Sequence, residues 1–314
     1  MIARFTRLLL LAQAAFAFGL TLLLQSAGLI DRAWLATALA CGIVVLLRLL
    51  ITANNFLLAC YFGSATPPAH RLNLRQTCWL LIDEFLASLL VSSWSMPFRG
   101  FAASRASASH TGLPVLLVHG YACNSGYWTG MRRALLAAGV EHRAIDLEPM
   151  NASIDTYAAQ LATAIEQLCH DTGKQQVIIV AHSMGGLATR AYVRAQGAAR
   201  MAAAITLGTP HHGSGLSQFA PGLNCRQMGW IGRRNVGQPS HWLLDLAAQE
   251  DSALRARFVS IYSHQDNIVS PQTSSHFDDA KNIEVHGIGH VKLGRDARII
   301  ALVMDEVRRI SNAS

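Results

Sequence analysis

The chain has few charged residues for its length. Only 14% of its 314 residues are Asp, Glu, Lys or Arg, whereas 51% are hydrophobic and the mean hydropathy is +0.27. Soluble domains carry about a quarter charged residues, so the composition disfavours a disordered chain, a collagen and an ordinary fully soluble protein. The length suggests roughly two domain-sized units, which is ample for a buried core.

The sequence also has no cluster of basic residues and no closely spaced pair of cysteines. The net charge is +7 and the pI about 9.4, yet no stretch forms the Lys/Arg stripe that nucleic-acid binding requires. The six cysteines show no C-x-x-C spacing, and the chain is far too long for a disulfide scaffold. We therefore expect no nucleic-acid partner.

The charge that is present lies mostly outside the first 100 residues, which hold seven of the 26 Lys/Arg and three of the 19 Asp/Glu. Leu8 to Ile30 carries no charge at all. At about 1.5 Å per residue this run can cross a bilayer core of about 30 Å. Ala15 to Ala17 offers an A-x-A signal-peptidase site, but apolar sequence continues well past it, so a retained anchor is favoured over a cleaved signal peptide.

A second apolar stretch runs from Ala33 to about Phe62 and ends at Gly63 and a Pro-Pro pair. Together the two stretches predict a transmembrane hairpin within residues 1–65. Arg48 weakens this prediction, because a charge at the helix centre costs about 2.5 to 3.5 kcal/mol on insertion scales, although near a helix end it can snorkel.

Residues 66–110 are expected to form an interfacial helix and a linker. The segment from Cys78 to Trp94 is apolar, but it contains Asp83 and Glu84. These carboxylates favour a helix at the membrane interface or packed on protein over a third span.

Arginines outside the two spans predict the orientation. Arg4 and Arg7 precede the first span, and Arg71 and Arg75 follow the second. The positive-inside tendency then places both ends of the hairpin, and the domain that follows, on the cytoplasmic face of a bacterial inner membrane.

The alternative is one span or three, which would put the C-terminal domain outside the cytoplasm. Cys123 and Cys225 could then form a disulfide, which the reducing cytoplasm would not permit.

From residue 111 to 314 the pattern alternates between buried strands and helices, which predicts an α/β domain with a largely parallel sheet. The expected strands are Pro114–Val118, His142–Leu147, Val177–Val180, Ala203–Leu207, Phe258–Tyr262 and Ile283–Val285. The expected helices are Tyr127–Ala138, Ile154–Cys169 with Ser153 as its N-cap, Gly185–Ala195 and Arg295–Arg309.

Ser183 is the first candidate for chemistry. It follows a buried strand directly and precedes a helix, in the motif Ala181-His-Ser-Met-Gly185. A serine on such a tight strand-to-helix turn exposes its hydroxyl at the carboxyl edge of the sheet, above a helix N-terminus. Small residues two positions before and after it are required because the turn brings their backbones close to neighbouring elements.

An oxyanion site is predicted beside this serine. Backbone N–H groups from the residue after the nucleophile and from the loop after an earlier strand supply such a site, which here means Met184 and Tyr121. His119, which ends that earlier strand, is interpreted as a structural histidine, because the base is expected downstream of the serine.

The acid and the base should follow in the order Ser, Asp, His. Asp266 comes just after one predicted strand and His290 lies in a Gly-flanked loop after the next, so both are placed at the edge that carries Ser183. His286 is the rival base. The rival acids, which lie in a segment typical of helix or linker, are Asp278 and Asp279.

These residues resemble the α/β-hydrolase superfamily, specifically bacterial triacylglycerol lipases and related esterases, over about residues 112–310. The resemblance rests on the motifs LLVHGY, AHSMGG, ITLGTPHHGS, QDNIVSP and GIGHVKL. It implies a membrane-anchored serine ester hydrolase that acts on acyl ester or lipid substrates through a Ser183, His290 and Asp266 triad and an acyl-enzyme, without a metal or organic cofactor. An acyltransferase with the same triad, and a non-catalytic membrane scaffold, are the alternatives.

A long insertion from His211 to about Arg257 is predicted to be a cap over an acyl pocket. Its apolar residues need a partner: Leu216, Phe219, Leu223, Met228, Trp230, Ile231, Trp242, Leu243 and Leu246. The other interpretation is a small helical subdomain packed on the core. With the single-Gly loop at His119 to Tyr121, which accompanies such substrates in the resembling lipases, the insertion predicts a preference for medium or long acyl chains.

Overall fold

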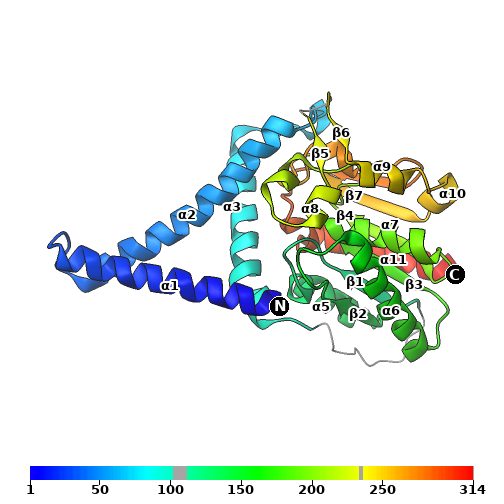
Figure 1. Ribbon diagram of the computed structural model, residues 1–314, viewed down its shortest axis with the longest axis horizontal. Coiled ribbons are helices and arrows are strands. Elements are labelled where there is room, and N and C mark those ends of the chain that lie inside the picture. The colour runs from blue at the N-terminus through cyan, green and yellow to red at the C-terminus, as the bar shows by residue number, and fades with distance from the viewer. Residues whose placement is uncertain (102–111, 233–235, 314) are drawn as a thin grey trace.

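The computed structural model describes residues 1–101, 112–232 and 236–313. Two long helices, α1 (Ile2–Ser26) and α2 (Ala33–Phe62), project away from an α/β domain, and α3 (Leu74–Leu90) runs between them and that domain (Figure 1). Three short elements connect these parts. They are the 3-10 helix η1 (Pro68–His70), the π-helical turn η2 (Val91–Ser95) and the helical turn α4 (Met96–Phe98).

The α/β domain is built on a six-stranded sheet with the order β2-β1-β3-β4-β7-β8, in which every neighbouring pair is parallel. Its strands are β1 (Val115–Val118), β2 (His142–Ile145), β3 (Val177–His182), β4 (Met201–Leu207), β7 (Phe258–Ser263) and β8 (Lys281–Val285). The predicted α/β class with a parallel sheet is confirmed. The carboxyl ends of β3, β7 and β8 lie at one edge, because parallel strands share their direction.

Helices cover both faces of this sheet, and an apolar core lies on each side. They are α5 (Thr129–Ala137), preceded by η3 (Ser125–Trp128), α6 (Ile154–Thr172), α7 (Met184–Gln196) and α11 (Ala297–Ala313). Ser153 caps α6 as predicted, since its side chain accepts a hydrogen bond from the N–H of Asp155.

The insertion after β4 folds into short elements over the carboxyl edge of the sheet. These are η4 (Gly215–Phe219), α8 (Leu223–Gln227), β5 (Trp230–Ile231), β6 (Gln238–Pro239), α9 (His241–Ala247) and α10 (Ser252–Arg255). Leu243 and Leu246 are buried and Leu223 is exposed, so part of the insertion packs on the core and part does not. A buried ion pair between Arg190 and Glu250 joins its end to α7, with an N–O distance of 2.7 Å.

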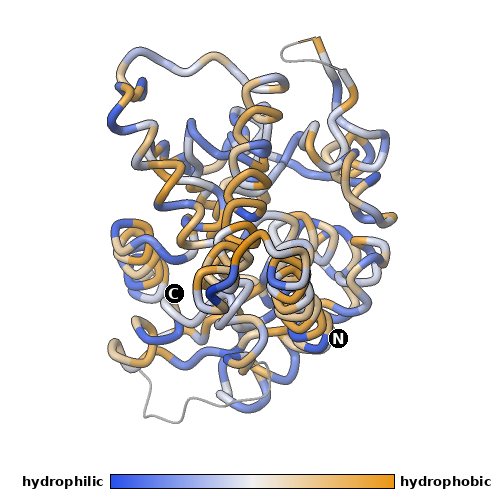
Figure 2. The backbone as a smooth tube through the Cα atoms, turned by 90° about the vertical axis from the view of Figure 1, so that its left-hand side faces the viewer, coloured by the Kyte–Doolittle hydropathy of each residue, from blue (hydrophilic) through white to orange (hydrophobic). Residues whose placement is uncertain are grey.

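Three N-terminal helices are long and apolar enough to cross a membrane: Ile2–Ser26, Ala33–Phe62 and the composite helix Leu74–Phe98. Large apolar side chains along the first two are widely exposed, for example Leu8, Phe18 and Ile51, and Figure 2 shows the hydrophobic course of these helices. So much unpartnered apolar surface is typical of contact with lipid.

The third helix is expected to be interfacial or packed on protein because it contains Asp83 and Glu84. By length and composition alone it could also cross a membrane. The structure pairs both carboxylates with the α/β domain, through Lys292 and the backbone that follows His290. Arg48 is likewise bound, since its guanidinium donates to the hydroxyls of Ser92 and Ser93.

Candidate active site

Ser183 occupies a strained turn between β3 and α7. Its backbone has φ 54° and ψ −129°, a region that non-glycine residues rarely adopt. Neighbouring backbones come very close: a Cβ added at Gly185 would lie 2.6 Å from the carbonyl oxygen of Val118, and one at Gly120 would lie 2.8 Å from the Cβ of Ser183. The sharp turn therefore requires glycine at both positions.

His290 and Asp266 lie in contact at the same sheet edge. The Nδ1 of His290 is 2.7 Å from the Oδ2 of Asp266, and both side chains are almost fully buried. The other carboxylate oxygen of Asp266 accepts the N–H groups of Ile268 at 2.8 Å and Val269 at 2.7 Å. These two bonds fix the carboxylate so that its free oxygen orients the imidazole.

The loop that carries His290 is held by further polar contacts that the sequence did not reveal. The His290 N–H donates to Oδ1 of Asn267 at 2.9 Å, and its carbonyl lies 3.0 Å from Nε2 of His182. Burial lowers the pKa of His182 well below its usual value, so the ring is neutral and donates from Nε2. The only available signal was the position of His182 directly before Ser183.

Glu84, on helix α3, binds the same loop from the N-terminal side. Its carboxylate accepts the N–H of Val291 at 2.8 Å and that of Lys292 at 3.0 Å, while the Nζ of Lys292 lies 2.7 Å from Oδ1 of Asp83. The residue is 1% exposed. Helix α3 therefore positions the backbone immediately after His290.

The surroundings of His290 raise the pKa of its imidazole above the ordinary value. Burial alone lowers this pKa, but the charge of Asp266, its hydrogen bond and the charge of Glu84 raise it more strongly. All three contributions favour the protonated ring, which is the form that a general base reaches after it accepts a proton.

The residues predicted for the oxyanion site flank Ser183. Met184 is the first residue of α7, and Tyr121 lines the same cavity as Ser183. Within the described residues, neither backbone N–H donates a hydrogen bond, which leaves both available to a ligand. His119 has a different arrangement, in which Nε2 accepts the N–H of Leu147 at 3.0 Å and Nδ1 donates to the carbonyl of Gly120.

The rival base and one of the two rival acids make contacts that do not involve Ser183. The Nδ1 of His286 is 3.3 Å from the Nδ1 of His70, and Asp278 forms an ion pair with His276 at 3.7 Å. Asp279 is exposed in a turn with φ 63°. Cys123 and Cys225, the two halves of the conditional disulfide, are free thiols.

A cavity of about 450 Å³ opens over Ser183 and His290. Helices α2, α3 and the π-helical turn supply one wall, with Asn55, Leu58, Ser88, Val91 and Ser92. The insertion supplies another, with Ser214, Leu216, Ser217, Phe219, Ala220 and Met228. The two walls meet where the ring of Phe62 packs against the backbone of Gly215 and near Phe219.

Comparison with known proteins identifies the family to which this chain belongs. A family model described as the alpha/beta hydrolase family matches residues 115–293, more than half of the chain. The chain belongs to the alpha/beta hydrolase family. Helices α1 to α4 lie outside the matched region of this hydrolase.

Two curated relatives are triacylglycerol lipases. One, from Burkholderia plantarii, is 29% identical over 157 residues, which cover 48% of this chain and 43% of the relative. The other, from Pseudarthrobacter phenanthrenivorans, is 32% identical over 117 residues, 35% of this chain and 36% of the relative. The alignments thus span less than half of either relative.

Solved structures share the fold. Bacillus licheniformis lipase BlEst2 in mature form matches with a TM-score of 0.54 and 19% identity, over 66% of this chain and 96% of its own. Aspergillus fumigatus lipase B matches with a TM-score of 0.56 and 18% identity, over 67% and 55%. At these identities the likeness shows a shared fold.

The contact between His290 and Asp266 predicts a pH effect on the reactivity of Ser183. If His290 is the base that activates Ser183, labelling by a fluorophosphonate needs the neutral imidazole, and the labelling rate should fall as the pH drops through the raised pKa of His290. Asp266→Asn removes two contributions that raise this pKa, so the pH at which the labelling rate falls should move lower. The labelling rate at neutral pH should also drop, by up to about 10⁴-fold. Stopped-time labelling across a pH series measures both.

Asp278→Asn is the matched control, and it should keep the wild-type profile. If the labelling rate of Asp266→Asn fell at the same acid pH as that of the wild type, Asp266 would not govern the titration of His290.

Proposed function

We propose that the chain is a membrane-anchored serine ester hydrolase that cleaves acyl esters of lipids. Ser183 is the nucleophile, His290 the general base and Asp266 the acid that orients it. The N–H groups of Tyr121 and Met184 hold the oxyanion. The observation that carries the proposal is the 2.7 Å contact between His290 and Asp266 beside a cavity that Ser183 and His290 share.

The reaction then runs in two acyl-transfer steps. His290 takes the hydroxyl proton of Ser183 as its oxygen attacks the ester carbonyl, and returns it to the leaving alcohol. Water, activated by the same imidazole, releases the acyl group and regenerates the serine. Each oxyanion donor contributes about 3 to 4 kcal/mol in well-studied hydrolases.

The walls of the cavity favour a lipid substrate. Leu58 and Val91 from the N-terminal helices face the same space as Leu216 and Met228 from the insertion, which supports the interpretation of the insertion as a cap. Each methylene buried there contributes about 0.8 kcal/mol. The names of the two triacylglycerol lipases among the relatives agree with an acyl ester of a lipid as substrate.

We further propose that α1 and α2 cross the membrane as a hairpin, with the hydrolase domain on the cytoplasmic face. Asp83 and Glu84 lie near the middle of α3 and bind Val291 and Lys292 of the α/β domain, which is difficult to combine with a third span. Fusions of alkaline phosphatase and of a fluorescent protein to the C-terminus test this orientation. A fluorescent fusion with an inactive phosphatase is expected, and the reverse pair of results would overturn it.

Graded p-nitrophenyl esters provide the direct test of the proposed activity. The wild type should hydrolyse medium or long acyl esters fastest, and Ser183→Ala should lose both hydrolysis and fluorophosphonate labelling. The variant should remain folded, because alanine keeps the Cβ and removes only a hydroxyl that lies at the wall of the cavity. Circular dichroism serves as the folding control. A labelled alanine variant would identify another serine as the nucleophile, and a rate optimum at acetate would contradict the acyl pocket.

A further inference from the structure

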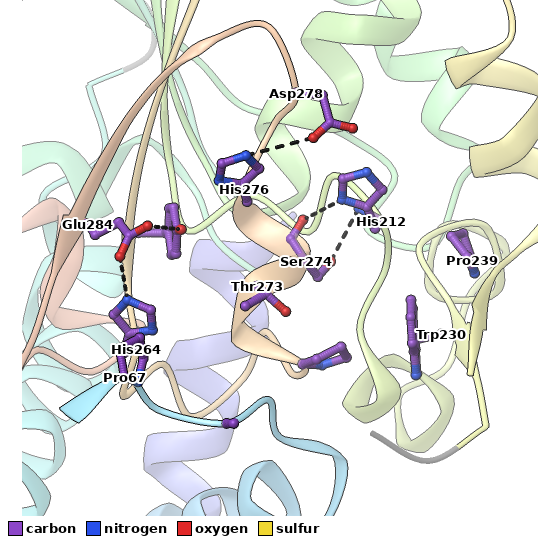
Figure 3. A pocket seen from close by; sticks show the side chains of 13 residues that line it. Pro67, His212, Trp230, Pro239, His264, Thr273, Ser274, His276, Asp278 and Glu284 are labelled. Carbon is purple, nitrogen blue, oxygen red and sulfur yellow. Dashed lines mark hydrogen bonds and ion pairs between the residues drawn. The ribbon is translucent and has the colours of Figure 1, made fainter. Parts of the chain in front are cut away.

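A second cavity, of about 590 Å³, is lined by residues on both sides of Asp266 in the sequence, among them His264 and Pro271 (Figure 3). Neither Ser183 nor His290 lines it. Three histidines do: His212, His264 and His276. Figure 3 shows His264 and Glu284 facing one another at one end of this cavity, and His276 beside Asp278 at another.

His70 joins His264 and Glu284 at that end. The Nε2 of His264 lies 2.8 Å from Oε2 of Glu284, and the Nε2 of His70 lies 3.6 Å from the same oxygen. The side chains of all three residues offer ligand atoms within 4.8 Å of one another. They come from three separate segments: η1, the loop after β7, and β8.

We propose that His70, His264 and Glu284 bind a divalent transition-metal ion, with zinc as the ion that their chemistry suits best. Two imidazole nitrogens and one carboxylate oxygen form a common zinc ligand set, which leaves a fourth position for water. Ligand atoms about 2.0 to 2.1 Å from a tetrahedral zinc ion lie about 3.3 Å apart. The observed separations of 2.8 and 3.6 Å bracket that spacing. The rings of His70 and His264 are stacked at an interplanar angle of 21°, so one of them must rotate before both nitrogens point at the same ion.

Neighbouring groups support the ligands in the way that metal sites require. The Tyr262 hydroxyl donates to the other oxygen of Glu284 at 2.9 Å, and the Nδ1 of His70 lies 3.3 Å from Nδ1 of His286. Such contacts orient a ligating carboxylate and fix the tautomer of a ligating imidazole.

The ion would brace the hydrolase site without taking part in the reaction. His264 precedes Asp266 by two residues, and Glu284 lies on the strand that leads to the His290 loop. Gln265 already links these parts, since its amide donates to the carbonyl of His70 at 2.9 Å and accepts the N–H of Gly287 at 2.8 Å. A metal here would cross-link both loops to the connector between α2 and α3.

Zinc binding by the purified full-length chain in detergent tests this inference. After chelator treatment and titration with ZnCl₂, the wild type should bind about one zinc per chain by elemental analysis, and its Tm should rise by at least about 5 °C at saturation. His264→Ala and Glu284→Gln should each bind zinc at least tenfold more weakly and lose the rise in Tm.

His276→Ala is the matched control, because it removes a histidine from the same cavity without touching the three ligands. It should bind zinc as the wild type does. Circular dichroism shows that each variant is folded. Absence of stoichiometric zinc in the wild type, or wild-type affinity in both His264→Ala and Glu284→Gln, would overturn the site and leave an ordinary cluster of hydrogen-bonded histidines.

Discussion

The carboxylate of Glu84 is the contact on which the arrangement of this protein depends. It comes from an apolar helix outside the family-matched region, is buried, and accepts the two backbone N–H groups that follow His290. A buried carboxylate is costly unless hydrogen bonds satisfy it, so helix α3 and the His290 loop must stay together. The N-terminal helices are therefore part of the structure around Ser183 and His290, rather than a tether joined to a separate domain.

This constraint explains why the cavity has two kinds of wall. The insertion covers one side of Ser183, as in a capped hydrolase, while α2 and the end of α3 cover the other. Since α2 is apolar enough to cross a membrane, a lipid leaving the bilayer along this helix would meet the cavity directly. The hydrolase chemistry and the membrane attachment that we propose thus converge on one surface.

Sequence reasoning located the parts whose signals are local. Ser183 sits between a buried strand and a helix, and Asp266 and His290 follow parallel strands, so their common edge could be predicted, although only the fold shows the contact of 2.7 Å. Glu84 could not be found in this way, because its partners lie 207 and 208 residues further along the chain. The grouping of His70 with His264 and Glu284 was hidden for the same reason, and Arg48 looked unfavourable because the hydroxyls that bind it belong to another helix.

The central claim is that helix α2 forms part of the acyl pocket, and one pair of substitutions tests it most directly. Leu58 lines the cavity, whereas its neighbour Leu57 is 70% exposed and points away from it. Leu58→Trp should reduce kcat/KM for long-chain p-nitrophenyl esters by at least about tenfold through lost acyl-chain burial, and should spare the acetate ester. Leu57→Trp should behave as the wild type. Equal long-chain rates in the Leu58 variant and the wild type would contradict the account.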